Sequence, residues 1–254
     1  MGGRGKGPMN IALVLSGGIG SRLISEVPKQ YVTVRGKMIV IHCLQVLCAH
    51  PMIDAVHVVA ERAWWEPVLT ELPDVSKLKG FSVPGINRQL SILNGLADME
   101  RYADDDDVVL IHDAVRPLVS NKLISDTLSG ATGHDGCVPV LPMKDTVYLS
   151  GDGVHLTDRL ERSKILAGQA PEAFVYGKYR RANEQLTDDE MMGIYGSAEP
   201  ALMGGLDIAT VQGDERNFKI TTNGDLERYR KICEQVVVQW QKELCDFDKL
   251  TIAP

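Results

Sequence analysis

The feature that most constrains the fold of this chain is a short apolar run that ends abruptly in glycine. The run is "IALVL", Ile11–Leu15, and the segment "SGGIGSR", Ser16–Arg22, follows it directly. A continuous apolar run of this length is typical of a strand that is buried on both faces, as in a parallel sheet. The run therefore predicts a parallel sheet that helices cover on both sides.

Strand and helix patterns alternate along the rest of the chain. Apolar runs predict strands at Ala55–Ala60 and Val108–Ile111, whereas Ile39–Cys48 and the segment "RQLSILNGLADM" have the apolar spacing of helices. Phe81–Gly85 is predicted as a short strand, and "PEAFVYGKYRRANEQL" as one helix. This alternation predicts an α/β fold with a mostly parallel sheet. In such sheets, ligands bind outside the carboxyl ends of the strands.

The last third of the chain contains two further patterns. Residues 144–162 alternate in polarity around a Gly-Asp-Gly turn, which predicts a hairpin arm. The tail has helical spacing as far as Leu244, with Thr222 or Asn223 as its N-cap. We expect one domain over residues 10–254, with the arm at about 144–164. Residues 1–9 are expected to be disordered or a remnant of an expression tag.

Composition and charge argue against several classes of protein. The net charge of −7 disfavours a general nucleic-acid-binding protein, which needs a basic face. No apolar stretch approaches the ~20 residues of a membrane span, and the first residues lack the apolar core of a secretory signal. An odd number of cysteines without zinc-ligand spacing is typical of reduced thiols, so we expect a cytoplasmic protein. The five cysteines are Cys43, Cys48, Cys137, Cys233 and Cys245.

The glycine-rich loop is the first candidate for function. Glycine lets backbone N–H groups approach a ligand closely, and successive N–H groups form a nest for an anion. Arg22 can add a bidentate contact to a phosphate, and the alternative is a tight turn without a ligand. The dinucleotide motif GxGxxG needs a glycine at Leu23, and the hydrolase motif GxSxG needs one at Val14. The P-loop motif GxxxxGK[ST] does not occur, so all three enzyme classes fail on this loop.

Two further segments supply groups that suit a triphosphate. Pro28 constrains the chain just before Lys29, so this lysine can return to the phosphate site, although an exposed surface lysine is the alternative. Asp113 follows a predicted buried strand, where a carboxylate near a triphosphate is the expected ligand for Mg²⁺. The alternative for Asp113 is a turn cap. The acidic run Asp104–Asp107 fits a solvated turn better than a metal site.

Other polar residues suit a nucleoside or a second substrate. The residues Asn87, Arg88 and Ser91 lie at the start of a predicted helix, where they can hold a nucleobase or a triphosphate. The alternative is that Asn87 only caps the helix. The basic residues Arg159, Arg162 and Lys219 suit a second anionic substrate, with exposed salt bridges as the alternative.

Together these segments resemble the polyol-phosphate cytidylyltransferases, over roughly Asn10–Leu244. The matching segments are "SGGIGSRL", "PKQY", "NRQLSILNG", "IHDAVRP", "ERSKILAGQAPEAF", "LTDDE" and "NFKITTNGDL". The resemblance implies a Rossmann-like, three-layer nucleotidyltransferase fold with a protruding β-arm that exchanges across a homodimer. It also implies that CTP and a polyol phosphate are the substrates and that Mg²⁺ assists. The polyol phosphate attacks the α-phosphorus, and pyrophosphate leaves.

The resemblance also implies roles for individual residues. Arg22 and Lys29 match the basic pair that stabilises charge on the reacting and leaving phosphates, and we place Lys219 with them as catalytic. Asp113 matches the acid that holds Mg²⁺. The predicted nucleotide-binding residues are Ser16, Gly17, Gly18, Gly20, Gly85, Arg88 and Ser91. The predicted acceptor-binding residues are Thr146, Arg162 and Thr187, with Arg162 reaching into the partner's site.

The identity of the acceptor is the least constrained part of this interpretation. The main expectation is transfer of CMP to 2-C-methyl-D-erythritol 4-phosphate, the substrate of an isoprenoid pathway. D-Ribitol 5-phosphate, or another pentitol phosphate of wall or glycan synthesis, is the alternative, since "GGIGSR" and "HDAVRP" resemble that branch more. The usual Gln-Thr-Pro-Gln is "QAPE" here, Gln169–Glu172, and the segment Val140–Asp145 is longer than expected. A sugar-1-phosphate nucleotidyltransferase and a non-catalytic nucleotide-binding protein also stay open at this point.

Overall fold

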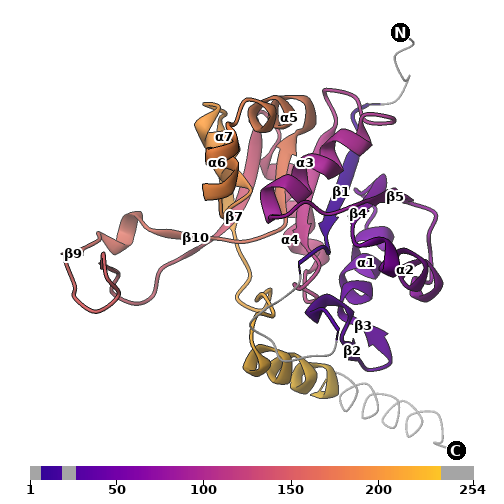
Figure 1. Ribbon diagram of the computed structural model, residues 1–254, viewed down its shortest axis with the longest axis horizontal. Coiled ribbons are helices and arrows are strands. Elements are labelled where there is room, and N and C mark those ends of the chain that lie inside the picture. The colour runs from indigo at the N-terminus through magenta and orange to yellow at the C-terminus, as the bar shows by residue number, and fades with distance from the viewer. Residues whose placement is uncertain (1–6, 19–26, 236–254) are drawn as a thin grey trace, which may run out of the picture.

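The computed structural model describes residues 7–18 and 27–235. Its centre is an eight-stranded sheet in the order β10-β7-β11-β6-β1-β4-β5, with β12 paired to β7 (Figure 1). The strands are β1 (Asn10–Leu15), β4 (Ala55–Val59), β5 (Leu78–Ser82), β6 (Val108–Asp113), β7 (Gly136–Pro142), β10 (Leu166–Gly168), β11 (Glu172–Val175) and β12 (Ile208–Gln212). The pairs β1–β4, β1–β6, β4–β5 and β7–β12 are parallel, and β10 and β11 run antiparallel to their neighbours. The predicted α/β fold with a mostly parallel sheet is confirmed.

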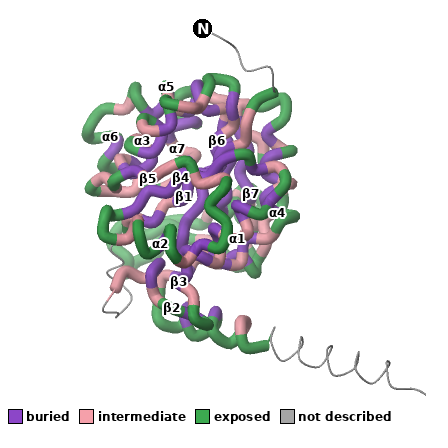
Figure 2. The backbone as a smooth tube through the Cα atoms, turned by 90° about the vertical axis from the view of Figure 1, so that its right-hand side faces the viewer, coloured by how far each residue is buried: buried purple, intermediate pink, exposed green. Residues whose placement is uncertain are grey.

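Helices cover both faces of this sheet and complete three layers. They are α1 (Ile39–Ala49), α2 (Trp65–Glu71), α3 (Arg88–Met99), α4 (Asn121–Gly130), α5 (Tyr176–Glu184), α6 (Asp188–Gly193) and α7 (Ala198–Met203). A C-terminal helix, described over residues 223–235, packs instead in a separate apolar cluster with Val34 and Ile39. One apolar cluster joins α1, α2 and α4 to one face of the sheet, and a second joins α3, α5 and α7 to the other. Figure 2 shows the buried strands inside and the more exposed helices around them.

The alternation of side chains along β1 explains these two clusters. Ile11 and Leu13 belong to the cluster with α3, whereas Ala12 and Val14 belong to the cluster with α1. Successive side chains of a strand point to opposite faces, so a strand between two helix layers needs an uninterrupted apolar run. Burial of a large aliphatic side chain such as Leu13 contributes roughly 1.5–3 kcal/mol.

Two short antiparallel hairpins lie outside the main sheet. In the first, β2 (Thr33–Val34) pairs with β3 (Lys37–Met38). In the second, β8 (Tyr148–Leu149) pairs with β9 (Asp158–Arg159), as the pattern of residues 144–162 predicts. This second hairpin is the arm, and it extends away from the sheet beyond β10 (Figure 1).

The sequence prediction was wrong or displaced in two segments. The segment from Pro171 to Leu186 was predicted as one helix, but β11 occupies its first part and α5 begins only at Tyr176. These residues form a strand because β11 pairs with both β6 and β7. The buried Phe174 is also a residue type that is common in strands. The strand predicted at Phe81–Gly85 ends at Ser82, because Pro84 has no N–H group for a ladder hydrogen bond.

The start of the C-terminal helix is predicted correctly. The Oγ1 atom of Thr222 accepts a hydrogen bond from the N–H of Asp225 at 3.2 Å, as an N-cap residue does. The part of the predicted helix from residue 236 to Leu244 lies outside the described residues. None of the helices within the described ranges is both long and apolar enough to cross a membrane.

Candidate active site

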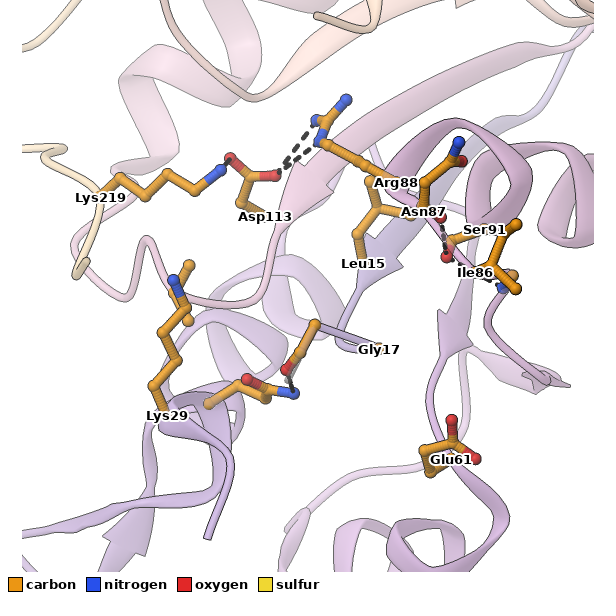
Figure 3. Close-up of a pocket in the computed structure, with 14 residues that line it drawn as sticks. Leu15, Gly17, Lys29, Glu61, Ile86, Asn87, Arg88, Ser91, Asp113 and Lys219 are labelled. Atoms are coloured by element: carbon orange, nitrogen blue, oxygen red, sulfur yellow. Dashed lines mark hydrogen bonds and ion pairs between the residues drawn. The ribbon is translucent and has the colours of Figure 1, made fainter. Parts of the chain in front are cut away.

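The carboxyl ends of three neighbouring parallel strands meet at one edge of the sheet. The last residues of β1, β4 and β6 are in register, with Leu15 opposite both Val59 and Asp113. The turns that follow these strands, together with the start of α3, enclose a cavity of about 390 Å³ (Figure 3). The residues that line it are Leu15, Gly17, Gly18, Lys29, Gln30, Glu61, Gly85, Ile86, Asn87, Arg88, Ser91, Asp113, Val115 and Lys219.

The cavity brings together predicted residues from distant parts of the chain. They are Gly17, Gly18, Lys29, Gly85, Arg88, Ser91, Asp113 and Lys219. Ser16 lies beneath the loop and is buried, with 1% of the residue exposed. Gly20 and Arg22 lie outside the described residues, so their predicted roles remain predictions.

The first turn of the glycine loop is held from one side by two side chains. The amide nitrogen of Gln30 donates to the carbonyl oxygens of Ser16 at 2.7 Å and Gly18 at 2.9 Å. The hydroxyl of Tyr31 also donates to the Ser16 carbonyl at 2.9 Å. The C=O and N–H groups of a trans peptide point in opposite directions, so this arrangement turns the Gly17 N–H away from Gln30. The loop thereby has a fixed backbone donor.

Close packing requires a glycine in this loop. A Cβ atom at Gly17 would lie 2.3 Å from the Cβ of Pro84, in the turn after β5. The loop after β1 and the loop before α3 therefore approach each other more closely than any side chain allows. This contact forms one wall of the cavity.

Asp113 lies at the centre of a cluster of three cations. Its Oδ1 atom is 3.1 Å from Nη2 of Arg88, and its Oδ2 atom is 3.0 Å from Nζ of Lys219 and 3.3 Å from Nε of Arg116. Burial alone would raise the pKa of Asp113, but the three cations outweigh it and hold this pKa far below its usual range. Asp113 is therefore ionised at neutral pH, and the cluster keeps a net positive charge for an anionic ligand.

Arg88 is fixed on its other side by a second buried network. Its Nη1 atom donates to the hydroxyl of Ser197 at 2.7 Å, and Ser197 also hydrogen-bonds the carboxyl of Glu172. Burial raises the pKa of Glu172 to about 7, although Arg88 opposes that shift. The guanidinium group of Arg88 thus has a set position between Asp113 and Ser197.

The start of α3 combines capping with cavity lining. The side chain of Asn87 accepts a hydrogen bond from the N–H of Leu90 at 2.8 Å, so Asn87 is the N-cap of α3. The hydroxyl of Ser91 accepts from the N–H of Gly85 at 3.1 Å and donates to the Asn87 carbonyl at 2.7 Å. These contacts fix the turn that lines the cavity beside Arg88, which is what a binding wall requires.

The three residues predicted to bind the acceptor do not line this cavity. Thr187 is exposed and forms a capping box with Glu190 at the start of α6. Thr146 and Arg162 are exposed at the arm, and Nη1 of Arg162 donates to the carbonyl of Lys144 at 2.7 Å. Within the described part of this single chain, the acceptor residues are therefore apart from the residues that line the cavity.

Sequence reasoning missed several polar residues that shape the cavity or its supports, and five of them do so through charged or amide groups or a hydroxyl close to Arg88. They are Gln30, Glu61, Arg116, Glu172 and Ser197. Two of them could have been found from the sequence, because each lies close to a predicted site residue. Gln30 directly follows Lys29, and Arg116 comes three residues after Asp113. Glu172 and Ser197 join Arg88 only through tertiary packing, and no local pattern indicates that contact.

Comparison with known proteins gives one consistent family. The family model described as "IspD: 2-C-methyl-D-erythritol 4-phosphate cytidylyltransferase" matches residues 10–235. A 2-C-methyl-D-erythritol 4-phosphate cytidylyltransferase of Geotalea uraniireducens is 35% identical over 220 residues, which cover 85% of this chain and 92% of the relative. A ribitol-5-phosphate cytidylyltransferase of Streptococcus agalactiae is 30% identical over 227 residues, which cover 88% of this chain and 95% of the relative.

Solved structures give the same fold. A 4-diphosphocytidyl-2C-methyl-D-erythritol synthase matches with a TM-score of 0.76 at 24% identity, covering 90% of this chain and 100% of that chain. A 2-C-methyl-D-erythritol 4-phosphate cytidylyltransferase of Francisella tularensis matches with a TM-score of 0.75 at 24% identity, covering 87% of this chain and 98% of that chain. The three-layer architecture is therefore that of these structures.

Proposed function

Because the chain belongs to the 2-C-methyl-D-erythritol 4-phosphate cytidylyltransferase family, we propose that it transfers CMP from CTP to 2-C-methyl-D-erythritol 4-phosphate. A phosphate oxygen of the acceptor forms a bond to the α-phosphorus of CTP. The bond from that phosphorus to the β-phosphate bridging oxygen breaks, and pyrophosphate leaves. The observation that carries the proposal is the cavity in which Lys29, Arg88 and Lys219 lie beside the glycine loop (Figure 3).

The residues of the cavity act by positioning the substrates and neutralising their charge. Phosphoryl transfer needs little covalent chemistry from the protein, and cations aimed at the phosphates stabilise the charge of the transition state. Lys29 and Lys219 approach from two sides of the cavity, and the Gly17 N–H adds a fixed donor. Arg88 is held by Asp113 and Ser197, so it does not need to reorganise during the reaction.

We propose Asp113 as the protein ligand of a Mg²⁺ ion. Among the described residues there is no group of three or more metal-binding side chains, so the donor set fits an ion held mainly by triphosphate oxygens and water. Both oxygens of Asp113 contact cations, but a carboxylate has about four lone-pair sites and can accept a further partner. When bound, the ion supplies neutralisation of the triphosphate charge.

A homodimer would complete the acceptor side of the site. The arm carries exposed apolar side chains at Tyr148, Leu149, Val154 and Leu156. Such side chains favour burial against a second copy. In this arrangement Thr146 and Arg162 of the partner subunit join Lys219 at the acceptor phosphate.

We also propose a cytoplasmic location, because the cysteines within the described ranges are free thiols.

Ribitol 5-phosphate is the second candidate acceptor. The relative named ribitol-5-phosphate cytidylyltransferase aligns over 95% of its length, compared with 92% for the Geotalea relative named for methylerythritol phosphate. The buried Glu172 of "QAPE" also departs from the usual glutamine, close to Arg88. These two observations keep the pentitol phosphates as a specific alternative.

Release of pyrophosphate tests the function and the choice of acceptor together. The protein is incubated with CTP, Mg²⁺ and either 2-C-methyl-D-erythritol 4-phosphate or D-ribitol 5-phosphate. We expect kcat/KM for the methylerythritol phosphate to be higher by a factor of about 10² or more, as expected for a site built around substrate hydroxyl groups. A reversed preference would establish the second candidate. No release with any polyol phosphate would contradict the transferase function itself.

A further inference from the structure

Among the residues that the structure describes, one negative side chain lines the cavity at the end away from its cations. Glu61 follows Ala60, whose N–H continues the sheet by donating to the Ser82 carbonyl at 3.0 Å. Figure 3 shows Glu61 across the cavity from Asp113 and Lys219, on the same side as Ile86 and Ser91, with its carboxylate turned toward the open space. The cavity is therefore polarised, with cations at one end and a carboxylate at the other.

The carboxylate of Glu61 has no structural task that explains its position. Glu61 is the N-cap residue of the 3₁₀ helix Arg62–Trp64, but its side chain makes no capping hydrogen bond. Its backbone carbonyl accepts a hydrogen bond from the N–H of Trp64 at 2.9 Å. No ion pair or side-chain hydrogen bond of Glu61 occurs among the residues that the structure describes. The next cation along the chain, Arg62, lies over the ring of Trp65 at 5.1 Å instead.

The charges of the cavity determine how a nucleoside triphosphate fits. The triphosphate is attracted to Lys29, Arg88 and Lys219 and repelled by Glu61, so the base lies at the Glu61 end. At that end, the hydroxyl of Ser91 is already bonded to the Gly85 N–H and the Asn87 carbonyl. Glu61 is thus the acidic side chain that remains available to a base.

An ionised carboxylate can only accept hydrogen bonds. Cytosine carries an amino group at C4, which donates, whereas uracil carries a carbonyl oxygen there, which accepts. A carboxylate that faces C4 therefore accepts a hydrogen bond from the amino group of cytosine, whereas it is repelled by the carbonyl oxygen of uracil. The two bases also differ at N3, which accepts in cytosine and carries an N–H donor in uracil, so the carboxylate discriminates through the C4 group that it faces.

We propose that Glu61 is a specificity-determining residue, whose carboxylate accepts a hydrogen bond from the C4 amino group of cytosine and so selects CTP over UTP. The proposal rests on the proposed function, because that function makes a cytidine nucleotide the ligand. It goes beyond that function by assigning the choice of base to one side chain. Bases without a C4 amino group lose both the hydrogen bond and the favourable charge contact.

Calorimetric binding of CTP and UTP, each with Mg²⁺, tests the proposal without requiring turnover. We expect the unmodified protein to bind CTP at least 10-fold more tightly than UTP, since a hydrogen bond to a charged group contributes about 1.5–3 kcal/mol. In Glu61→Ala this ratio falls toward one through weaker CTP binding. In Glu61→Gln the ratio also falls, but UTP binding improves as well, because the amide can donate to the C4 oxygen of uracil.

Glu66→Gln is the matched control, because it removes the same charge from an exposed position on α2 outside the cavity lining. This control should retain the full CTP preference. A preference that survives both Glu61 variants, or is absent from the unmodified protein, overturns the proposal. If the preference follows Glu61 but no polyol phosphate releases pyrophosphate, the proposed function fails while the base assignment stands.

Discussion

At the scale of single residues, Asp113 decides how the cations of the cavity are arranged. Arg88, Arg116 and Lys219 converge within 3.0–3.3 Å of its two oxygens. Three cations this close repel one another strongly in a partly buried site, so the carboxylate is needed before any ligand binds. The same cations leave a net positive charge, which a triphosphate can neutralise.

Lys29 gives a direct prediction for catalysis. It begins the 3₁₀ helix Lys29–Tyr31 and lines the cavity beside the glycine loop. Because its charge is expected to act mainly in the transition state, Lys29→Ala should lower kcat by about 10²–10³-fold. Steady-state rates and calorimetric CTP binding separate this effect from simple loss of affinity. Lys79→Ala, at an exposed position on β5, is the control, and a kcat for Lys29→Ala within threefold of it would contradict the assigned role.

Glu172 gives a prediction for the pH dependence of stability. Burial raises its pKa from 4.5 in the unfolded chain to about 7 in the folded protein, against the opposing charge of Arg88. The folded state therefore binds this proton more tightly, and the contribution of Glu172 to stability is fully present below pH 4.5 and is lost as the pH rises through 7. The corresponding loss is on the order of 3 kcal/mol.

The variant Glu172→Gln removes this titration and keeps the shape of the side chain. Urea unfolding at pH 5 and pH 8 should show the unmodified protein losing stability relative to Glu172→Gln as the pH rises. The free energy of unfolding is compared between the two proteins at each pH. An equal difference at both values would mean that Glu172 does not titrate in this range.

At the scale of secondary structure elements, the loop between β5 and α3 is held tightly against the helix that follows it. A Cβ atom at Gly85 would lie 2.4 Å from the Cβ of Leu90 and 2.7 Å from its backbone carbon, at the start of α3. The loop passes so close to the helix that only glycine fits. This contact holds the N–H of Gly85 against Ser91.

The substitution Gly85→Ala should therefore displace the loop from α3. We expect a loss of about 1–3 kcal/mol in stability, as in overpacked cores, and weaker CTP binding from the displaced wall. Gly151→Ala in the arm is the control, because nothing lies within 4 Å of a Cβ atom there. Thermal unfolding and calorimetry measure the two effects, and unfolding temperatures that match between the variants would contradict the steric argument.

Elements with a strong local signal are those that the sequence predicts best. The helix predicted at "RQLSILNGLADM" is α3 with the same bounds, and the apolar run Ile11–Leu15 lies within β1. The strand β11 was missed because its residues precede a helix directly and their structure depends on pairing with β6 and β7. Local patterns do not contain that pairing.

The same limit applies to the candidate site. Lys29 and Asp113 could be selected as site candidates from the sequence. Lys29 directly follows Pro28, and Asp113 comes just after the apolar run Val108–Ile111. Glu61 could not be selected in this way, since a glutamate after a strand is usually a solvated surface residue. The role that we propose for Glu61 rests on its three-dimensional position in the cavity, with cations at the opposite end. When the tertiary structure brings charged side chains together from distant segments, their spacing along the sequence shows no recognisable pattern.

At the scale of the whole molecule, the predicted site residues lie in two separate places, the cavity and the arm. The cavity residues come from the sheet and its loops, whereas Thr146 and Arg162 lie at the base of a hairpin that extends away from the sheet (Figure 1). Exposed side chains such as Leu156 and Val154 lie on that hairpin. The homodimer that we propose, in which each arm is buried against a second copy, would account for both features.

Mixing two inactive variants tests this arrangement. Lys29→Ala damages the cavity, and Arg162→Ala damages the arm that we expect to serve the partner's cavity. In mixed dimers one of the two sites then carries both changes and the other carries neither, so activity should recover to roughly a quarter of the unmodified level. The rate of pyrophosphate release by the mixture is compared with the sum of the separate variants. A mixture no more active than that sum would indicate that each arm serves its own chain.

The central claim is that the cavity joins CMP to a polyol phosphate through a new diphosphate bond. Phosphorus magnetic resonance of one reaction with CTP, Mg²⁺ and 2-C-methyl-D-erythritol 4-phosphate measures this directly. We predict two coupled signals of an unsymmetrical diphosphate, together with free pyrophosphate in equal amount. Formation of CMP and pyrophosphate without the coupled signals, or no change in CTP, would contradict the claim.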